Sequence, residues 1–368
     1  MRIANFTDTY IPHNNGIATI LYGLHHTKKG WDDQIFGPIK HPDVTGVSGI
    51  PFPLFPEYKI ALNTGWLEKE ARDFDLIHNH TPYGMFYYGI KISKRLGKPL
   101  VGSFHTDPAA IFGALVPLDS AGGRLLTWPT WQYLIYLYRK CDVVIATSEW
   151  VKTQLEARKL GRHIEIIPNG VNIKKFSPDI DSQQFRDRYG IPDRPMVFFA
   201  GRLEHKKDPQ TFLRAAIESK SDAVFVVSGR GELEEKLRKM CRDMPNIIFT
   251  GYLPDELIPQ AFAAADLFVM PSEMETQGIV LLEALASGTP CIATNTGIAK
   301  DVIDPEFLIE PRDANGLAEK VDALIEDKKR RKKLARHGRK LVEKEYSLDV
   351  MVKRLGQLYD IVCEPRLG

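Results

Sequence analysis

The sequence has few cysteines and no excess of charge of either sign, and each of these absences argues against a class of protein. The four cysteines, Cys141, Cys241, Cys291 and Cys363, are far apart and form no C-x-x-C pair. This spacing argues against a zinc site or a disulfide framework. Lys and Arg number 49 and Asp and Glu number 47, for a net charge of +2. A nucleic-acid partner is not expected, because its phosphates would require a strongly basic surface.

Long apolar runs are also missing. No stretch of about eighteen apolar residues occurs, which argues against a transmembrane helix. Residues 1–7 show neither the charged region nor the apolar segment of a signal peptide. We therefore expect a cytoplasmic location, with any contact to the inner face of the membrane peripheral. The full G-x-G-x-x-G fingerprint is absent too, which counts against NAD as a cofactor.

The sequence does contain short β-branched or aromatic runs that alternate with helical patterns from end to end. Such alternation is typical of βαβ units, which build parallel sheets with helices on both faces. With 368 residues, the chain is long enough for two such domains. The predicted strands are residues 3–7, 76–80, 100–105, 143–148 and 164–168 in the first half, and 196–200, 223–229, 247–251, 267–270 and 291–294 in the second.

A turn-rich stretch separates the two halves. Asn169-Gly170-Val171-Asn172 is followed by Phe176-Ser177-Pro178-Asp179, and such clusters are typical of interdomain linkers. We therefore predict a first domain at 1–175 and a second at 176–347. In doubly wound folds, ligands bind outside the carboxyl ends of the strands. A cleft between two such domains would bring two sets of these loops together.

The most informative loop precedes a helix predicted at 278–288. Glu275 lies in the loop and Glu283 lies within the helix. The free N–H groups at a helix N-terminus favour phosphate, and carboxylates on either side can accept hydrogen bonds from hydroxyls. This combination suits a sugar nucleotide. An isolated pair of this kind is more often a solvated loop residue and a helix-surface carboxylate.

Two cations follow another strand of the second half. The fork of Arg202 can grip a phosphate and Lys207 can act as a point charge. Together with a helix N-terminus, they could neutralise a departing nucleoside diphosphate without a metal. The alternative is a solvated basic turn, which is our expectation for Lys206. The Asp-x-Asp pairs at 73–75 and 179–181 precede a strand or fall in the linker, so we interpret them as turn carboxylates.

Loops of the first half carry weaker signals. Gly16 stands at the mouth of a helix, where a small residue lets the backbone approach a phosphate, but Asn-Gly is also an ordinary turn. His105 and Asp107 follow a strand and are expected at the edge of the cleft, but a lone histidine is more often structural. His78 and His80 share one face of their strand. No third ligand follows at usable spacing, so no metal site is predicted.

Taken together, these loops resemble the retaining glycosyltransferases of family 4, which have the two-domain GT-B architecture. The resemblance covers nearly the whole chain. It implies two Rossmann-like, doubly wound α/β domains facing each other across a cleft, with a last helix at about 348–368 packed back on the first domain. The motifs that carry it are Phe6-Thr7-Asp8-Thr9-Tyr10-Ile11-Pro12, Asn15-Gly16, Ile77-His78-Asn79-His80-Thr81-Pro82, Phe104-His105-Thr106-Asp107, Ile167-Pro168-Asn169-Gly170-Val171, Gly201-Arg202-Leu203 with Lys206-Lys207, and the block at 275–290.

The resemblance also implies roles for individual residues. Glu275 would bind the hydroxyls of the donor sugar, and Glu283 would bind the ribose. Arg202 and Lys207 would bind the diphosphate, and His105 would lie beside the donor sugar near the reacting carbon. These assignments make His105, Arg202, Lys207 and Glu275 the catalytic candidates. Further donor-binding candidates are Gly16, Asn169, Gln277, Gly278 and Ile279, and the acceptor-side candidates are Tyr10, His80 and Asp107.

The implied reaction transfers a hexose, glucose or mannose, from a UDP- or GDP-sugar to a hydroxyl of a lipid, polyol or glycan. The anomeric configuration would be retained, with the leaving diphosphate helping to deprotonate the acceptor, and neither a metal nor a cofactor is expected. An inverting enzyme would need a general base, for which Asp107 is the candidate. Gln277 and Arg230 depart from the common family pattern, so the donor stays open. The alternatives are a sugar-nucleotide epimerase, a glycan phosphorylase and a non-catalytic binding module.

Two segments could contact a membrane. Residues 109–138 are rich in aromatic side chains, which could line an acceptor site or lie at a membrane interface. Packing of such side chains onto the core is the commoner outcome. Residues 328–333 are all basic and predict a helix with a solvated face. Attraction to anionic lipid is the alternative for this run.

Overall fold

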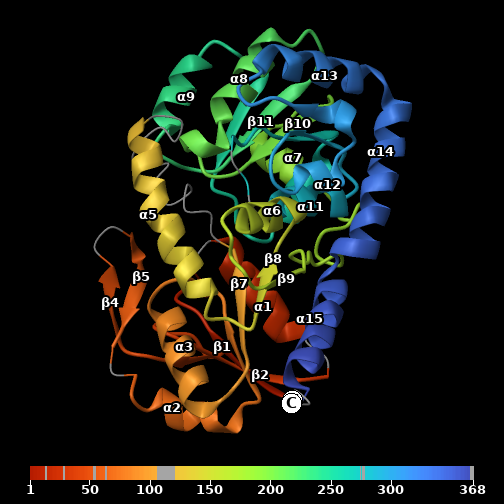
Figure 1. The fold of residues 1–368 in the computed structure, drawn as a ribbon. Helices are drawn as coiled ribbons and strands as arrows, with labels where there is room; N and C mark the ends of the chain where they lie inside the picture. The colour runs from red at the N-terminus through yellow and green to blue at the C-terminus, as the bar shows by residue number, and fades with distance from the viewer. Residues whose placement is uncertain are drawn as a thin grey trace. The chain divides into compact units, whose positions relative to one another are not determined.

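The computed structural model describes residues 1–12, 15–27, 30–52, 55–62, 64–105, 121–273, 275 and 278–364. Contacts divide this part of the chain into two compact units (Figure 1). The first unit contains the described residues up to Gly170 and those from Leu348 onward, and the second runs from Val171 to Ser347. Each unit is built on a parallel β-sheet with helices, which confirms the α/β fold class.

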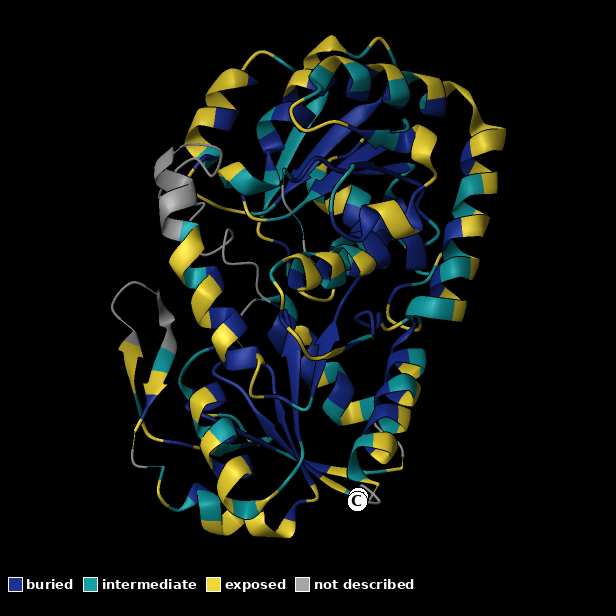
Figure 2. Ribbon diagram, viewed as in Figure 1, coloured by how far each residue is buried: buried dark blue, intermediate teal, exposed yellow. Residues whose placement is uncertain are grey.

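The parallel sheet of the first unit has the strand order β3-β2-β1-β6-β7-β8-β9. Its strands are mostly buried, because helices cover both faces (Figure 2). The order reverses at β1, which pairs with β2 on one side and with β6 on the other. Doubly wound domains bind ligands at such a switch point. The strands are β1 (Arg2–Phe6), β2 (Asp32–Gly37), β3 (Val44–Gly46), β6 (Leu76–Asn79), β7 (Leu100–Phe104), β8 (Val143–Ala146) and β9 (His163–Ile166), beside an antiparallel hairpin of β4 (Gly49–Phe52) and β5 (Phe55–Ala61).

Alternate residues of these strands face two different layers of helices. Phe6, Ile77 and Phe104 belong to a hydrophobic core shared with α3, α5 and α6. His78 and Ser103 point to the opposite face, beside α1 and α15. The helices of this unit are α1 (Gly16–Thr27), α2 (Leu67–Glu70), α3 (Gly84–Leu96), α5 (Ala121–Tyr138), α6 (Glu149–Ala157) and α15 (Leu348–Cys363).

The second unit has the strand order β12-β11-β10-β13-β14-β15, again parallel. Its switch point lies between β10 and β13. The strands are β10 (Met196–Ala200), β11 (Val224–Ser228), β12 (Ile247–Gly251), β13 (Leu267–Met270), β14 (Cys291–Thr294) and β15 (Leu308–Ile309). The helices are α7 (Gln183–Tyr189), α8 (Pro209–Glu218), α9 (Glu234–Met240), α10 (Ile258–Ala264), α11 (Ile279–Ala286), α12 (Ala299–Val302), α13 (Ala314–Glu326) and α14 (Lys328–Leu341).

Every predicted strand is present, and the helix expected at 278–288 forms as α11. The alternating pattern missed β2, β3, β4, β5 and β15. β2 begins with Asp32-Asp33-Gln34, which reads as a turn from sequence alone. β3 and β15 are only three and two residues long, so they show no periodicity. Such strands are stabilised by the neighbours with which they pair.

The described part of each segment considered for membrane contact, residues 121–138 and 328–333, is helical. No helix in the described part of the chain is long and apolar enough to cross a membrane. In α14, most of the basic side chains are exposed as predicted, but Arg331 is buried and pairs with Asp266. In α5, Trp131 is buried in the core and Trp128 is exposed. The part of that segment before Ala121 lies outside the described residues.

Helix α15 is joined to the sheet of the first unit through Tyr359. Its buried hydroxyl lies 2.7 Å from Nδ1 of His78, and Nε2 of His78 lies 2.7 Å from Oγ of Ser103. Without the hydroxyl, a buried ring nitrogen would lose its partner, which costs about 1–3 kcal/mol.

We therefore expect Tyr359→Phe to lower the free energy of unfolding by about 1–3 kcal/mol in urea denaturation. Tyr87→Phe is the control, because Tyr87 is 57% exposed and its substitution should change this free energy little. Equal stability of Tyr359→Phe and the wild type would show that the bond to His78 contributes nothing.

Candidate functional site

The loops after β10 and β13 meet at the switch point of the second unit. Nζ of Lys207 donates a charge-assisted hydrogen bond to Oε2 of Glu275, and these side chains are only 23% and 12% exposed. Burial raises the pKa of Glu275. The charge and hydrogen bond of Lys207 and a hydrogen bond from the Gly278 backbone outweigh burial and leave this pKa below its ordinary value. Glu275 is therefore an ionised carboxylate held by a lysine.

The N-terminus of α11 lies next to this carboxylate. Gly278 is its N-cap residue and adopts φ +50°, a conformation that glycine reaches without steric cost. The backbone N–H of Gly278 donates to the Glu275 carboxylate, whereas the first turn, which begins at Ile279, contains no acidic residue. The terminus therefore presents free N–H groups and the positive end of the helix dipole.

Further cations gather at the end of β10. Arg202 has a side chain 67% exposed, with Nη2 at 3.3 Å from Oε1 of Glu204. Lys206 was expected to be solvated, and this expectation is wrong. Its side chain is only 21% exposed and its Nζ lies 3.3 Å from the same carboxylate oxygen, while burial lowers its pKa. Lys206 is the middle residue of a short 3-10 helix, His205–Lys207, that begins directly after Glu204.

Glu283 lies one turn into α11. Burial raises the pKa of its carboxyl to about 8, against a lowering effect of Lys175 and with a further raising effect of Asp255. Near neutral pH this carboxyl is therefore mostly protonated in the unliganded protein. It can then donate a hydrogen bond to a hydroxyl as well as accept one.

The loops after β1 and β6 meet at the switch point of the first unit. Oδ2 of Asp8 accepts a hydrogen bond of 2.7 Å from Oγ1 of Thr81, and its Oδ1 accepts one of 3.1 Å from the backbone of Met85 in α3. Burial raises the pKa of Asp8 to about 7 in spite of these bonds. Sequence reasoning did not single out Asp8. Its position directly after β1, at the switch point, is the signal that could have found it.

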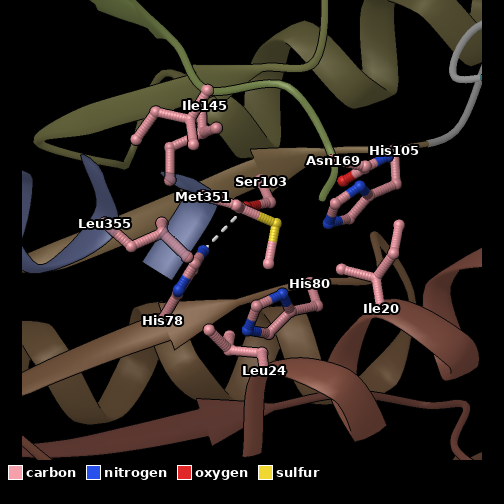
Figure 3. A pocket seen from close by; sticks show the side chains of 11 residues that line it. Ile20, Leu24, His78, His80, Ser103, His105, Ile145, Asn169, Met351 and Leu355 are labelled. Atoms are coloured by element: carbon pink, nitrogen blue, oxygen red, sulfur yellow. Dashed lines mark hydrogen bonds between the residues drawn. The ribbon is translucent and has the colours of Figure 1, made fainter. Parts of the chain in front are cut away.

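A cavity of about 20 Å³ lies between the sheet of this unit and helices α1 and α15 (Figure 3). The ring centroids of His78 and His80 are 3.9 Å apart, and those of His80 and His105 are 6.0 Å apart with nearly parallel rings. Burial lowers the pKa of all three, to about 3 for His78 and about 4 for His105, so they are neutral at pH 7. The other lining residues are Ile20, Leu24, Ser103, Ile145, Ile167, Asn169, Met351 and Leu355.

Hydrogen bonds assign the tautomer of His80. Nδ2 of Asn5 donates to Asp33 at 2.8 Å, so Oδ1 of Asn5 is the atom that accepts from Nε2 of His80 at 3.0 Å. Nδ1 of His80 is then a bare acceptor, and neither it nor Nδ2 of Asn169 has a partner within the described residues. One unpaired acceptor and one unpaired donor suit a hydroxyl group or a water molecule, and the cavity has room for one.

The remaining site residues predicted from the sequence either do not line this cavity or lie outside the described residues. Gly16 begins α1, where Oδ1 of Asn15 accepts from the backbone of Ala18 at 2.9 Å. Tyr10 is fully buried, its hydroxyl donates to Asp43 at 3.0 Å, and it is not among the described residues that line the cavity. Asp107 and Gln277 lie outside the described residues. Within the described part of the chain, no group of three or more His, Cys, Asp or Glu residues could hold a metal ion.

Two family models match the chain. The model described as Glycosyltransferase Family 4 matches residues 16–175, and that described as Glycosyl transferases group 1 matches residues 181–341. A GDP-mannose-dependent monoacylated alpha-(1-6)-phosphatidylinositol monomannoside mannosyltransferase of Corynebacterium glutamicum is 30% identical over 276 residues, which are 69% of this chain and 72% of the relative. The chain belongs to glycosyltransferase family 4, with a group 1 glycosyl transferase region in its second half. The resemblance inferred from the motifs is confirmed, and the family favours a glycosyltransferase over an epimerase.

A further relative and a solved structure are also similar to this chain. The sulfoquinovosyl transferase SQD2 of Arabidopsis thaliana is 30% identical over 336 residues, which are 86% of this chain and 62% of the relative, so the chain spans less than two thirds of that protein. The fold is similar to that of Anabaena Alr3699/HepE, crystallised in complex with UDP-glucose. The TM-score is 0.78 at 19% identity, over 98% of this chain and 100% of the other.

The buried histidines predict a pH dependence of stability. Burial holds the pKa of His105 to about 4 in the folded protein, whereas an unfolded histidine titrates near 6.5. Between these values the unfolded state binds a proton that the folded state does not, so the free energy of unfolding falls as the pH falls. When the pH is lowered from 6.5 to 4, we expect the free energy of unfolding of His105→Gln to fall by about 3 kcal/mol less than that of the wild type.

Urea denaturation at several pH values measures this difference. His337→Gln is the matched control, because His337 is exposed on α14. Parallel pH profiles of the wild type and His105→Gln would contradict the conclusion that burial keeps His105 neutral.

Proposed function

We propose that this glycosyltransferase transfers a hexose, glucose or mannose, from a nucleotide diphosphate sugar to a hydroxyl group of an acceptor. The observation that carries this proposal is the junction of Lys207, Glu275 and the N-terminus of α11 at the switch point of the second unit. The cation and the helix terminus suit a diphosphate, and the carboxylate suits sugar hydroxyls. The GDP-mannose-dependent relative and the UDP-glucose complex of the structural neighbour support the same class of donor.

Within this proposal, Lys207 and Arg202 bind the diphosphate. The backbone N–H of Ile279 contributes to the same cradle, together with that of Gly278, which donates to Glu275 in the unliganded protein. Glu275 binds hydroxyls of the donor hexose. Glu283 binds the ribose, a role that its largely protonated carboxyl supports because it can donate and accept. On the first unit, Gly16 and Asn169 belong to the donor side, and His105 lies beside the donor sugar.

The proposed mechanism retains the anomeric configuration and needs no metal. Loss of the nucleoside diphosphate places negative charge on its terminal phosphate, and preorganised cations and N–H groups stabilise charge that develops there. The leaving diphosphate then takes the proton of the acceptor hydroxyl on the same face of the sugar. Proton NMR of the product distinguishes this course from inversion, for which Asp107 would be the general base.

The acceptor side is proposed to include His80. Its bare Nδ1 can accept a hydrogen bond from a hydroxyl, whereas the hydroxyl of Tyr10 already donates to Asp43. A lipid, polyol or glycan hydroxyl is the proposed acceptor class. The phosphatidylinositol mannoside named for the Corynebacterium glutamicum relative makes glycolipid acceptors the first to test.

Titration of UDP-glucose, GDP-mannose, UDP and GDP into protein treated with a chelator tests the donor assignment by calorimetry. We expect one base series, uridine or guanosine, to bind, and the bound sugar nucleotide then serves as donor in the acceptor screen. Absence of binding by all four would contradict the proposed donor class.

Substitutions at the ion pair separate its two functions. We expect Lys207→Ala to abolish most transfer and to weaken binding of the free diphosphate, because it removes the point charge. Glu275→Ala should weaken binding of the sugar nucleotide more than binding of the free nucleoside diphosphate, because its carboxylate is assigned to the sugar.

Calorimetry and initial rates measure both effects, with Lys239→Ala on the exposed surface of α9 as the control. Wild-type turnover of Lys207→Ala would contradict the diphosphate assignment. Equal losses of both ligands in Glu275→Ala would contradict the sugar assignment.

A further inference from the structure

Arg312 has an unfavourable backbone conformation close to the loop that carries Glu275. The non-glycine residues with positive φ in the described part of the chain are Lys159, Asp208 and Arg312, at 55°, 45° and 65°. A residue with a Cβ atom adopts a positive φ only at a cost in free energy, and this conformation persists where surrounding contacts stabilise it. Asp208 is explained locally, since its carboxylate caps α8 by accepting from the backbone of Thr211. Arg312 is the third residue of a β-turn, in which Pro311 precedes it and the backbone N–H of Asp313 donates to the carbonyl oxygen of Glu310 at 3.3 Å. Such a turn requires a positive φ at its third residue, a position that glycine usually occupies.

The side chain of Arg312 makes a bidentate ion pair. Its Nε lies 2.5 Å from Oε1 of Glu273, and its Nη2 lies 2.9 Å from Oε2 of the same residue. Isolated ion pairs at the surface usually contribute little to stability, but a planar fork on a carboxylate fixes direction as well as distance. The pair therefore fixes where the Glu273 side chain lies relative to the loop before α13.

Glu273 is also held through its backbone. Its N–H donates to the carbonyl oxygen of Lys206 at 3.0 Å, next to Lys207 in the β10 loop. Behind the same loop, Gly297 has φ +51°, and a Cβ atom added there would lie 2.0 Å from the carbonyl oxygen of Glu275. The loop that bears Glu275 is therefore bounded by the loops that follow β10, β14 and β15.

We propose that Arg312 is a positioning residue for the donor sugar. By gripping Glu273, it fixes the loop two residues before Glu275 and so the direction in which the Glu275 carboxylate faces Lys207. The conformation of Arg312 is retained because glycine, which would relieve the strain, would also remove the guanidinium fork. This inference rests on the proposed function in one respect, the assignment of Glu275 to the donor sugar.

The substitution Arg312→Gly separates strain from positioning. Glycine adopts φ +65° without steric cost, so we expect the thermal midpoint of unfolding to stay equal or rise. We expect kcat/KM for the donor to fall roughly tenfold, since misplacement of a binding group is costly. A purely structural residue would instead lose stability and activity together. Arg312→Lys keeps the charge without the bidentate fork, so its kcat/KM for the donor should lie between those of the wild type and Arg312→Gly.

Two further variants isolate the pair itself. Glu273→Gln should lower kcat/KM as Arg312→Gly does, and the double variant should lose no more than either single one, because both remove the same contact. Arg330→Ala is the matched control. It removes another arginine from an exposed ion pair, with Glu306, and should leave kcat/KM unchanged.

Hydrogen exchange of the unliganded protein tests, without a donor, whether the ion pair of Arg312 and Glu273 stabilises the loop that carries Glu275. We expect the amide hydrogens of Glu273 and Gly278 to exchange faster in Arg312→Gly than in the wild type. Unchanged exchange, or faster exchange with an unchanged kcat/KM for the donor, would overturn the inference. If the wild type bound no sugar nucleotide, the proposed function would fail, while faster exchange would still support stabilisation of the loop by this ion pair.

Discussion

The ion pair between Lys207 and Glu275 is the interaction on which the candidate site of the second unit depends. Two mostly buried charges are tolerated because they pair with each other and because the backbone of Gly278 also donates to Glu275. They come from loops that are neighbours only where the strand order reverses, between β10 and β13. A ligand that carries both a phosphate and hydroxyls offers a replacement partner to each group. The unliganded pair therefore holds both side chains in place for such a ligand.

The switch point of the first unit is built with the opposite electrostatic character. Burial raises the pKa of Asp8 to about 7 and keeps His78, His80 and His105 neutral. At neutral pH the three histidines therefore act as hydrogen-bond donors and acceptors rather than as charges, and Asp8 is only partly ionised. Such groups discriminate uncharged hydroxyls by direction, whereas the cations of the second unit attract phosphate. The two switch points therefore differ in the chemistry that they offer to a ligand, neutral hydrogen-bonding groups in the first unit and charged groups in the second.

The sequence predicted what depends on local pattern and missed what depends on strand order. Strands buried on both faces are apolar runs, so they and the polar loops that follow them could be found. Lys207 and Glu275 were both chosen, but their contact spans 68 residues and exists only because β13 lies beside β10. That ion pair is therefore not encoded in the loop residues alone. The burial of Lys206 is a local effect that sequence reasoning missed, because its partner Glu204 and the 3-10 helix lie in the same loop.

Lys159, Asp208 and Arg312 have a positive φ, which side chains with a Cβ atom rarely adopt. Lys159 follows α6, where a left-handed residue commonly ends a helix, and Asp208 caps α8, so their positive φ has a local cause. Arg312 has a local cause as well, because it is the third residue of a β-turn closed by a hydrogen bond from Asp313 to the carbonyl oxygen of Glu310. Glycine is the usual residue at that position, so the arginine stands there at a cost in backbone conformation. Its bidentate contact with Glu273, two residues before Glu275, joins the loop after β15 to the loop that carries Glu275. Neither the composition nor the charge of the loop after β15 predicts that contact.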